Sequence, residues 1–96
     1  MTIPEELKVN REAVLRLDDR HGASDVRVFG STARGTARAD SDSDLLVTAG
    51  PVTSPWFPVG LKEDLERLLG RNVDVLTEEA LHWSIRDQVR REAIPL

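Results

Sequence analysis

Two aspartates at the head of an apolar run constrain the fold of this chain more than any other feature. Residues 42–48, Asp-Ser-Asp-Leu-Leu-Val-Thr, alternate between polar and apolar only at their start and are then apolar on both faces. Aspartate is disfavoured in strands, so a solvated face accounts for two of them only in part. The run predicts a strand whose far end is buried and whose near end, with Asp42 and Asp44, opens onto a cleft.

Helical and extended patterns alternate along the rest of the sequence. Apolar residues recur at helical intervals before Gly22 and again over residues 61–69, and Gly70 stands where a left-handed helix terminus is common. Thr2 and Glu5 have the spacing of a capping box. We expect helices over residues 3–20, 32–36, 61–70 and from 77 onward, the last with a stripe of Leu81, Ile85 and Val89, and strands over residues 26–29, 42–48 and 73–76.

This alternation predicts the α/β class. A chain of 96 residues suits one compact domain, residues 1–96, with no room for a second core. So few strands cannot make a full doubly wound sheet, and we expect a small mixed sheet of about three strands flanked by about four helices, open on one face. Because its core is small, the domain is expected to assemble with copies of itself or with a partner.

The composition narrows the classes of function. The formal net charge of -4, from 17 acidic and 13 basic side chains, argues against a protein that grips a polyanionic duplex, so a nucleic-acid partner is not expected. The absence of cysteine excludes disulfides and thiolate metal sites and suits a reducing, cytoplasmic setting. No apolar run approaches the roughly 20 residues of a membrane span. In such a chain, clustered acidic side chains are expected to bind a cation.

Three aspartates form the candidate catalytic centre. Asp42 and Asp44 are two residues apart on a strand and so project from the same face, and Asp74 joins them if its strand lies alongside. Uncompensated charges about 4 to 5 Å apart repel by about 3 to 4 kcal/mol at an effective dielectric near 20. Magnesium binds such carboxylates together with nucleotide phosphates, and two ions clamp the attacking and leaving oxygens. The three acids predict phosphoryl or nucleotidyl transfer.

The Gly30-Ser31 turn is the second half of the candidate site. Glycine lets the backbone approach a ligand closely, and the short helix that follows offers free amides to an anion. We expect a triphosphate to dock here, with the Ser31 hydroxyl donating to a phosphate oxygen. Arg34 either neutralises phosphate charge or anchors the helix.

These motifs together resemble a known family. Gly30-Ser31, ten residues and then Asp42-x-Asp44 is similar to the signature of minimal nucleotidyltransferases in the DNA polymerase β-like superfamily. Further likeness lies in residues 30–35 (Gly-Ser-Thr-Ala-Arg-Gly), 61–70, 72–76 (Asn-Val-Asp-Val-Leu) and 91–96 (Arg-Glu-Ala-Ile-Pro-Leu). The resemblance covers nearly the whole chain.

The resemblance implies a mechanism and a partner. Asp42 and Asp44 would bind both of two magnesium ions, and Asp74 would bind the ion that activates the attacking hydroxyl. Gly30 and Ser31 would contact the triphosphate of ATP. Small members of the family are similar to this chain in lacking a substrate domain, and many are antitoxins that transfer AMP to a tyrosine of a HEPN-domain ribonuclease toxin.

Two alternatives remain open at this point. The fold could neutralise its partner by contact alone, as a binding module without catalysis. Transfer to a small molecule or an RNA end is the other, although it normally calls for an added substrate-binding domain. The sequence identifies neither the acceptor nor the oligomeric state. Only the resemblance to the family favours ATP over other triphosphates.

The remaining aromatic and basic residues have ordinary explanations. Trp56, in the proline-rich stretch 49–60, is expected to seal the core edge rather than stack on a base, and the stretch itself is a loop on the cleft side or a clasp over the core. Trp83 lies off the apolar stripe and is a candidate partner contact. Arg86, Arg90 and Arg91 form a basic strip that is a solvated face or a docking surface.

Neither histidine is assigned a role. His21 stands at a helix end and His82 has no carboxylate at ligand spacing, so both are expected to be surface residues rather than catalysts.

Overall fold

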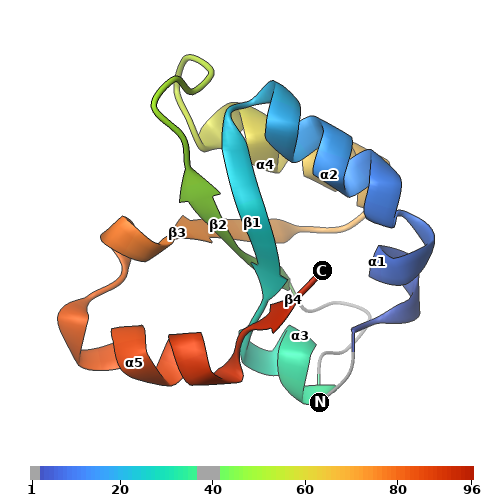
Figure 1. Ribbon diagram of the computed structural model, residues 1–96. Helices are drawn as coiled ribbons and strands as arrows, with labels where there is room; N and C mark the ends of the chain where they lie inside the picture. Colours follow the sequence, from blue (N-terminus) through green and yellow to red (C-terminus); the bar gives the residue numbers. More distant parts are fainter. Residues whose placement is uncertain (1–2, 37–41) are drawn as a thin grey trace.

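A four-stranded sheet with the strand order β3-β2-β1-β4 organises the chain (Figure 1). The structure, a computed structural model, describes residues 3–36 and 42–96. In chain order the elements are α1 (Glu5–Val9), α2 (Arg11–Arg20), β1 (Ala23–Val28), α3 (Gly30–Arg34), β2 (Ser43–Ala49), α4 (Val59–Leu69), β3 (Val73–Thr77), a 3-10 turn (Glu78–Ala80), α5 (Trp83–Glu92) and β4 (Ile94–Pro95). The expected α/β class is confirmed.

The sheet is mixed, as expected, but it has one strand more than the sequence patterns indicate. β1 pairs antiparallel with β2 and with β4, while β2 pairs parallel with β3. The additional strand β4 has only two residues, Ile94 and Pro95, which are too few to show any alternation. It is defined by its partners in β1, because Val28 lies opposite Ile94.

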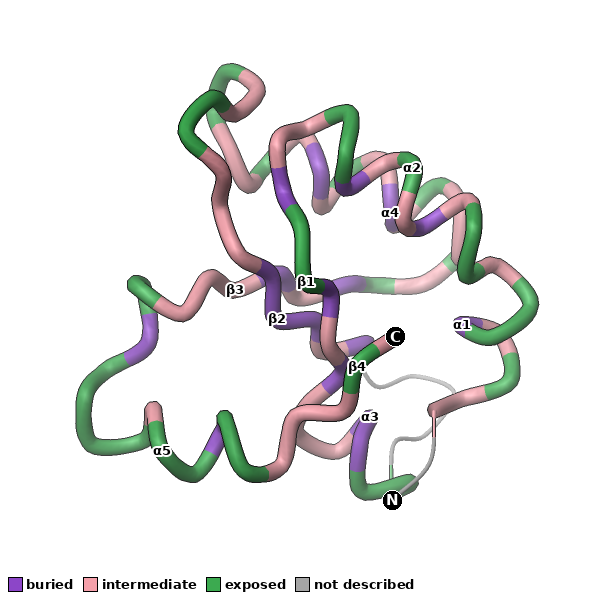
Figure 2. The backbone as a smooth tube through the Cα atoms, viewed as in Figure 1, coloured by how far each residue is buried: buried purple, intermediate pink, exposed green. Residues whose placement is uncertain are grey.

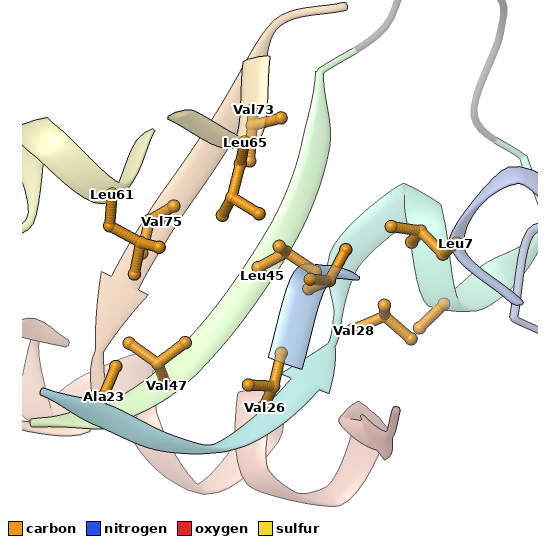
Figure 3. Packing of buried hydrophobic residues seen from close by; sticks show 12 residues of the cluster. Leu7, Ala23, Val26, Val28, Leu45, Val47, Leu61, Leu65, Val73 and Val75 are labelled. Atoms are coloured by element: carbon orange, nitrogen blue, oxygen red, sulfur yellow. The ribbon is translucent and has the colours of Figure 1, made fainter. Parts of the chain in front are cut away.

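The main core lies on one face of the sheet, under α1, α2 and α4 (Figures 1 and 2). Alternate residues of β2, Leu45 and Val47, point into it beside Val28 and against Leu61 and Leu65 of α4 (Figure 3). All five side chains are buried. On this face, β2 is therefore buried at its far end, as the sequence predicted.

The opposite face carries a second, smaller core. Leu46 of β2 packs there with Leu81 and with Val89 of α5. Because Leu45 and Leu46 point to opposite faces and both are fully buried, β2 is apolar on both sides at this point. This is the pattern that the sequence showed after Asp44.

The first helical region is divided, whereas a single helix over residues 3–20 was expected. Asn10 separates α1 from α2 with φ −97° and ψ 11°, and its side-chain amide donates to the carbonyl of Glu6 at 2.7 Å. Asparagine competes for local backbone groups in this way, which favours a helix boundary. The capping-box residue Thr2 lies outside the described residues.

The last helical region is also shorter than expected. Thr77 caps a 3-10 turn by accepting the N–H of Ala80, and α5 begins only at Trp83. Leu81 is therefore outside the helix, so the stripe counted from it is out of phase with α5. Leu81 and Val89 are buried, whereas Ile85 is 46% exposed, so the three residues of the expected stripe do not share one buried face.

The proline-rich stretch is a clasp and does not border the carboxylates. It follows the carboxyl end of β2, at the opposite end of that strand from α3 (Figure 1). Phe57 packs against the main core, whereas Trp56 is 87% exposed. The expectation that Trp56 seals the core is wrong, because its φ of 61° turns the backbone so that Phe57 takes the inward position.

Over residues 3–36 and 42–96, no helix has the length and apolar character that crossing a bilayer demands.

Candidate active site

Asp44 and Asp74 lie opposite each other on adjacent parallel strands. The register pairs Asp44 of β2 with Asp74 of β3, next to the pairs formed by Leu45 and Leu46. Neighbouring strands are about 4.8 Å apart, and residues in register point to the same face. The two carboxylates therefore share the face on which Leu46 packs against α5. The expectation that Asp74 stands beside Asp44 is met by this register.

The environment of Asp44 disfavours its negative charge. Burial raises the pKa of the Asp44 carboxyl, the charge of Asp74 raises it further, and Asp42 adds a smaller effect in the same direction. Hydrogen bonds from Thr32 and Ser31 lower this pKa in part. A cation bound between the carboxylates would offset both the cost of burying the charge of Asp44 and its repulsion by Asp74.

Asp42 is less enclosed than the other two aspartates. It is exposed and precedes the first residue of β2. Within the part of the chain that the structure describes, no three histidine, cysteine, aspartate or glutamate side chains gather closely enough to hold a metal ion together. The geometry provides a pair, Asp44 and Asp74, with Asp42 in electrostatic range, and the three-carboxylate centre stays a prediction.

Gly30 is required by its closeness to Asp44. Its φ is 61°, and a Cβ added to it would lie 2.8 Å from Asp44 Oδ2. Any other residue would therefore be strained in its backbone and would also displace the carboxylate. The next residue, Ser31, donates its hydroxyl to the same Oδ2 at 3.5 Å. The turn thus contacts the acidic centre, while its predicted contact with a triphosphate stays untested.

Arg34 acts as an anchor in this structure. Its guanidinium donates to Glu92 Oε2 at 3.2 Å and joins the end of α3 to the end of α5. The side chain remains half exposed. Of the two roles expected for Arg34, helix anchoring is observed, and phosphate neutralisation remains a prediction.

Thr32 is a site residue that the sequence patterns did not single out. It is 1% exposed, its Oγ1 accepts the backbone N–H of Asp44 at 2.9 Å, and the same hydroxyl lies 3.4 Å from Asp44 Oδ2. No periodicity marks this contact, because it depends on α3 turning back against β2. Its position beside Ser31 was the only available signal.

Lys62 of α4 is a second residue that was missed. Its ammonium donates to Glu66 Oε2 at 2.6 Å, which is the main reason that its pKa is raised, and the charges of Asp42 and Asp74 add smaller upward effects. Glu66 also accepts the N–H of Val73, next to Asp74, at 3.0 Å. The charged Lys62 ammonium is therefore close enough to Asp42 and Asp74 to interact with their carboxylates.

His21 has a structural role instead of a free surface position. Its Nδ1 is 2.6 Å from Ser54 Oγ and its Nε2 is 2.7 Å from Asp64 Oδ2. The ring is 12% exposed, so the expectation of a plain surface residue is wrong. These bonds join the end of α2 to the clasp and to α4, away from Asp44. His82 is exposed, as expected.

The basic strip on α5 is partly used inside the molecule. Arg86 donates to the carbonyl of Leu81 at 3.1 Å, and Arg90 donates to Glu78 Oε2 at 3.3 Å. Both arginines line a hollow of about 240 Å³ with Glu78 and Glu79, beyond the carboxyl end of β3. Arg91 is exposed, and Trp83 is 78% exposed, so both are accessible to a partner.

Comparisons with known proteins show the family of this chain and agree with its fold. The model of the nucleotidyltransferase domain family matches residues 10–96. Protein adenylyltransferase MntA of Thermococcus cleftensis is 40% identical over 78 residues, which cover 81% of this chain and 79% of that protein. A solved structure of a candidate minimal nucleotidyltransferase is 53% identical, covers 99% of this chain and 97% of the other, and has a TM-score of 0.86.

Solved toxin–antitoxin structures share the fold at greater distance. One, determined with AMP-PNP, is 24% identical, covers 96% of this chain and 72% of the other, and has a TM-score of 0.72. Two mutants of an MntA toxin–antitoxin pair align with TM-scores of 0.69 and 0.70. In one, two aspartates separated by one residue are changed to glutamate, and in the other a tyrosine is changed to alanine.

Proposed function

The chain belongs to the nucleotidyltransferase domain family, and on that premise we propose that it transfers AMP from magnesium-bound ATP to a tyrosine hydroxyl of a partner HEPN-domain ribonuclease toxin. It would thereby act as the antitoxin of a toxin–antitoxin pair. Its classification as a nucleotidyltransferase, expected from the Gly-Ser and Asp-x-Asp motifs, is confirmed by the family match. The acceptor and the HEPN identity of the partner are the proposed parts.

One observation carries the chemistry: Asp44 and Asp74 are in register on adjacent strands, with Gly30 packed against the Asp44 carboxylate. Carboxylate oxygens are hard donors of the kind that magnesium prefers, and the raised pKa of Asp44 indicates that a cation would be favoured there. The residues present therefore fit the ion. The chemistry that bound magnesium supplies is neutralisation of phosphate charge and a lower pKa of the attacking hydroxyl.

The reaction assigns a task to each element of the site. The tyrosine oxygen attacks the α-phosphorus, the bond from that phosphorus to the bridging oxygen breaks, and pyrophosphate leaves. Asp42 and Asp44 would hold the two ions, and Asp74 would help to remove the hydroxyl proton. Gly30 and Ser31 orient the triphosphate. Positioning and charge neutralisation supply most of the rate in such transfers.

The names of related proteins support a toxin as the acceptor. The relative from Thermococcus cleftensis is a protein adenylyltransferase, and three of the solved structures of similar fold are of toxin–antitoxin pairs, one of them with an ATP analogue. This chain contains no tyrosine. Any tyrosine-linked AMP formed in its presence therefore lies on another protein, which makes the proposal simple to test.

The test is transfer of label from α-labelled ATP, in the presence of magnesium, to the protein encoded beside this one. We expect one or more AMP units on a tyrosine of that partner and loss of transfer in Asp42→Asn and Asp44→Asn. Asp19→Asn, which removes an exposed aspartate on α2, is the matched control and should transfer normally. Mass spectrometry of the partner locates the acceptor.

The same variants separate the alternatives. If Asp42→Asn and Asp44→Asn still neutralise the partner in cells, the chain acts by contact, and the enzymatic proposal is wrong. Label on RNA or on a small molecule, with none on protein, would favour the third alternative.

A further inference from the structure

Asp44 lies one residue beyond the end of the β1–β2 ladder. The last pair of that ladder is Val28 with Leu45. The carbonyl of Asp44 still accepts the N–H of Phe29 at 3.2 Å, but β1 ends at Val28, and the carbonyl of Phe29 accepts the N–H of Ala33 at 3.3 Å instead. A buried backbone N–H left without an acceptor is costly. Something outside the sheet has to complete the bonding at this position.

Thr32 supplies this acceptor from α3. Its Oγ1 is 2.9 Å from the N–H nitrogen of Asp44 and 3.4 Å from Asp44 Oδ2. A threonine hydroxyl has one donor and two acceptor sites, so it can accept from the backbone and donate to the carboxylate at the same time. Thr32 therefore contacts both the main chain and the side chain of one residue.

From this double contact we propose that Thr32 is a positioning residue, which fixes the orientation of the Asp44 carboxylate for binding a divalent cation. The inference rests on the proposed function, in which Asp44 holds metal ions. Hydrogen bonds to carboxylates that ligate metals orient them, and loss of such a partner typically costs about 10- to 100-fold in metal affinity or activity.

Burial gives Thr32 this role in preference to its neighbour. Ser31 also reaches Asp44 Oδ2, but at 3.5 Å and from a partly exposed position. Thr32 is 1% exposed, so water cannot replace its hydroxyl, and its branched side chain has few rotamers within a helix. The enclosed hydroxyl holds the carboxylate, and Ser31 remains available to a ligand.

The test compares variants that separate the hydroxyl from the shape of the side chain. Thr32→Val keeps the shape and removes the hydroxyl, and Thr32→Ser keeps the hydroxyl. Thr48→Val, at the far end of β2, is the matched control for the same substitution. Mn²⁺ binding without nucleotide is measured by electron paramagnetic resonance, and kcat and KM for ATP are measured in transfer to the partner.

We expect Thr32→Val to bind Mn²⁺ about 10- to 100-fold more weakly and to lose a similar factor in kcat, with KM for ATP within about twofold of wild type. Thr32→Ser should restore both values, and Thr48→Val should change neither. Circular dichroism checks the fold of each variant, and Thr32→Ala takes the place of Thr32→Val if the latter does not fold.

A lower melting temperature with unchanged Mn²⁺ affinity would show that Thr32 only completes the backbone bonding, which would overturn the inference. Absence of Mn²⁺ binding by the wild type would overturn it as well. If the wild type binds Mn²⁺ and Thr32→Val weakens this binding, but no AMP reaches the partner, the positioning role stands and the proposed acceptor is wrong.

Discussion

Replacing Asp18 with asparagine should remove a large pH dependence from the stability of this protein. Asp18 is on α2 and is 1% exposed, and neither carboxyl oxygen has a hydrogen-bond partner within the described residues. Burial raises the pKa of Asp18 from 3.8 to about 7. The folded protein therefore keeps Asp18 protonated over a pH range in which the unfolded chain has already lost the proton.

The direction of the effect follows from this difference. Between pH 4 and pH 7 the folded state binds more protons than the unfolded state, so the free energy of unfolding falls as the pH rises. One pKa unit corresponds to about 1.4 kcal/mol, and a rise from 3.8 to about 7 therefore corresponds to a loss of about 4 kcal/mol across this range. Well above pH 7 the loss is complete and constant.

The assay is urea denaturation of wild type and Asp18→Asn at pH 4.5, 6 and 7.5. Asparagine does not titrate, so the difference in unfolding free energy between variant and wild type should shift in favour of the variant by several kcal/mol over this range. Asp64, Glu66 and Glu78 have lowered pKa values, but they are present in both proteins and cancel in the difference. Parallel pH profiles for the two proteins would refute the reasoning.

Two further substitutions test the geometry. Gly30→Ala should lower AMP transfer at least about tenfold and destabilise the fold by about 1 to 3 kcal/mol. The reason is that the new Cβ would lie 2.8 Å from Asp44 Oδ2 and that the backbone has a φ of 61°. Normal transfer and an unchanged urea midpoint would contradict this prediction. His21→Ala should cost about 1 to 3 kcal/mol by removing the bonds to Ser54 and Asp64, and it should speed proteolysis at the clasp while leaving transfer intact. Equal cleavage rates for His21→Ala and wild type would show that the clasp does not depend on His21.

The sequence predicted those elements whose periodicity is set by burial. β2 is buried on both faces beyond Asp44, and α4 presents Leu61 and Leu65 to the core, so their patterns are strong. Asn10 and β4 escaped prediction for different reasons. A helix break at Asn10 depends on one side-chain bond to Glu6, and the two residues of β4 are extended because β1 is beside them.

The candidate site shows the same division. Asp44 and Asp74 could be expected side by side, because parallel neighbours align and the register pairs the two residues. Asp42 precedes β2, and its place in the acidic centre stays a prediction. The contact of Thr32 with Asp44 could not be expected, since it depends on how α3 folds back across the end of β1. Trp56 was misplaced because its φ of 61°, which is rare for a bulky residue, leaves no mark in composition or spacing.

β2 also separates two surfaces that can evolve independently. Its first residues carry the acidic centre, and its last residue leads into the clasp with Trp56. Seven residues of strand span about 20 Å, which is more than two Debye lengths at physiological ionic strength. A change of charge in the clasp is therefore screened before it reaches Asp44. Mutations that adapt the clasp to new surroundings can accumulate there without retuning the ionisation of the carboxylates.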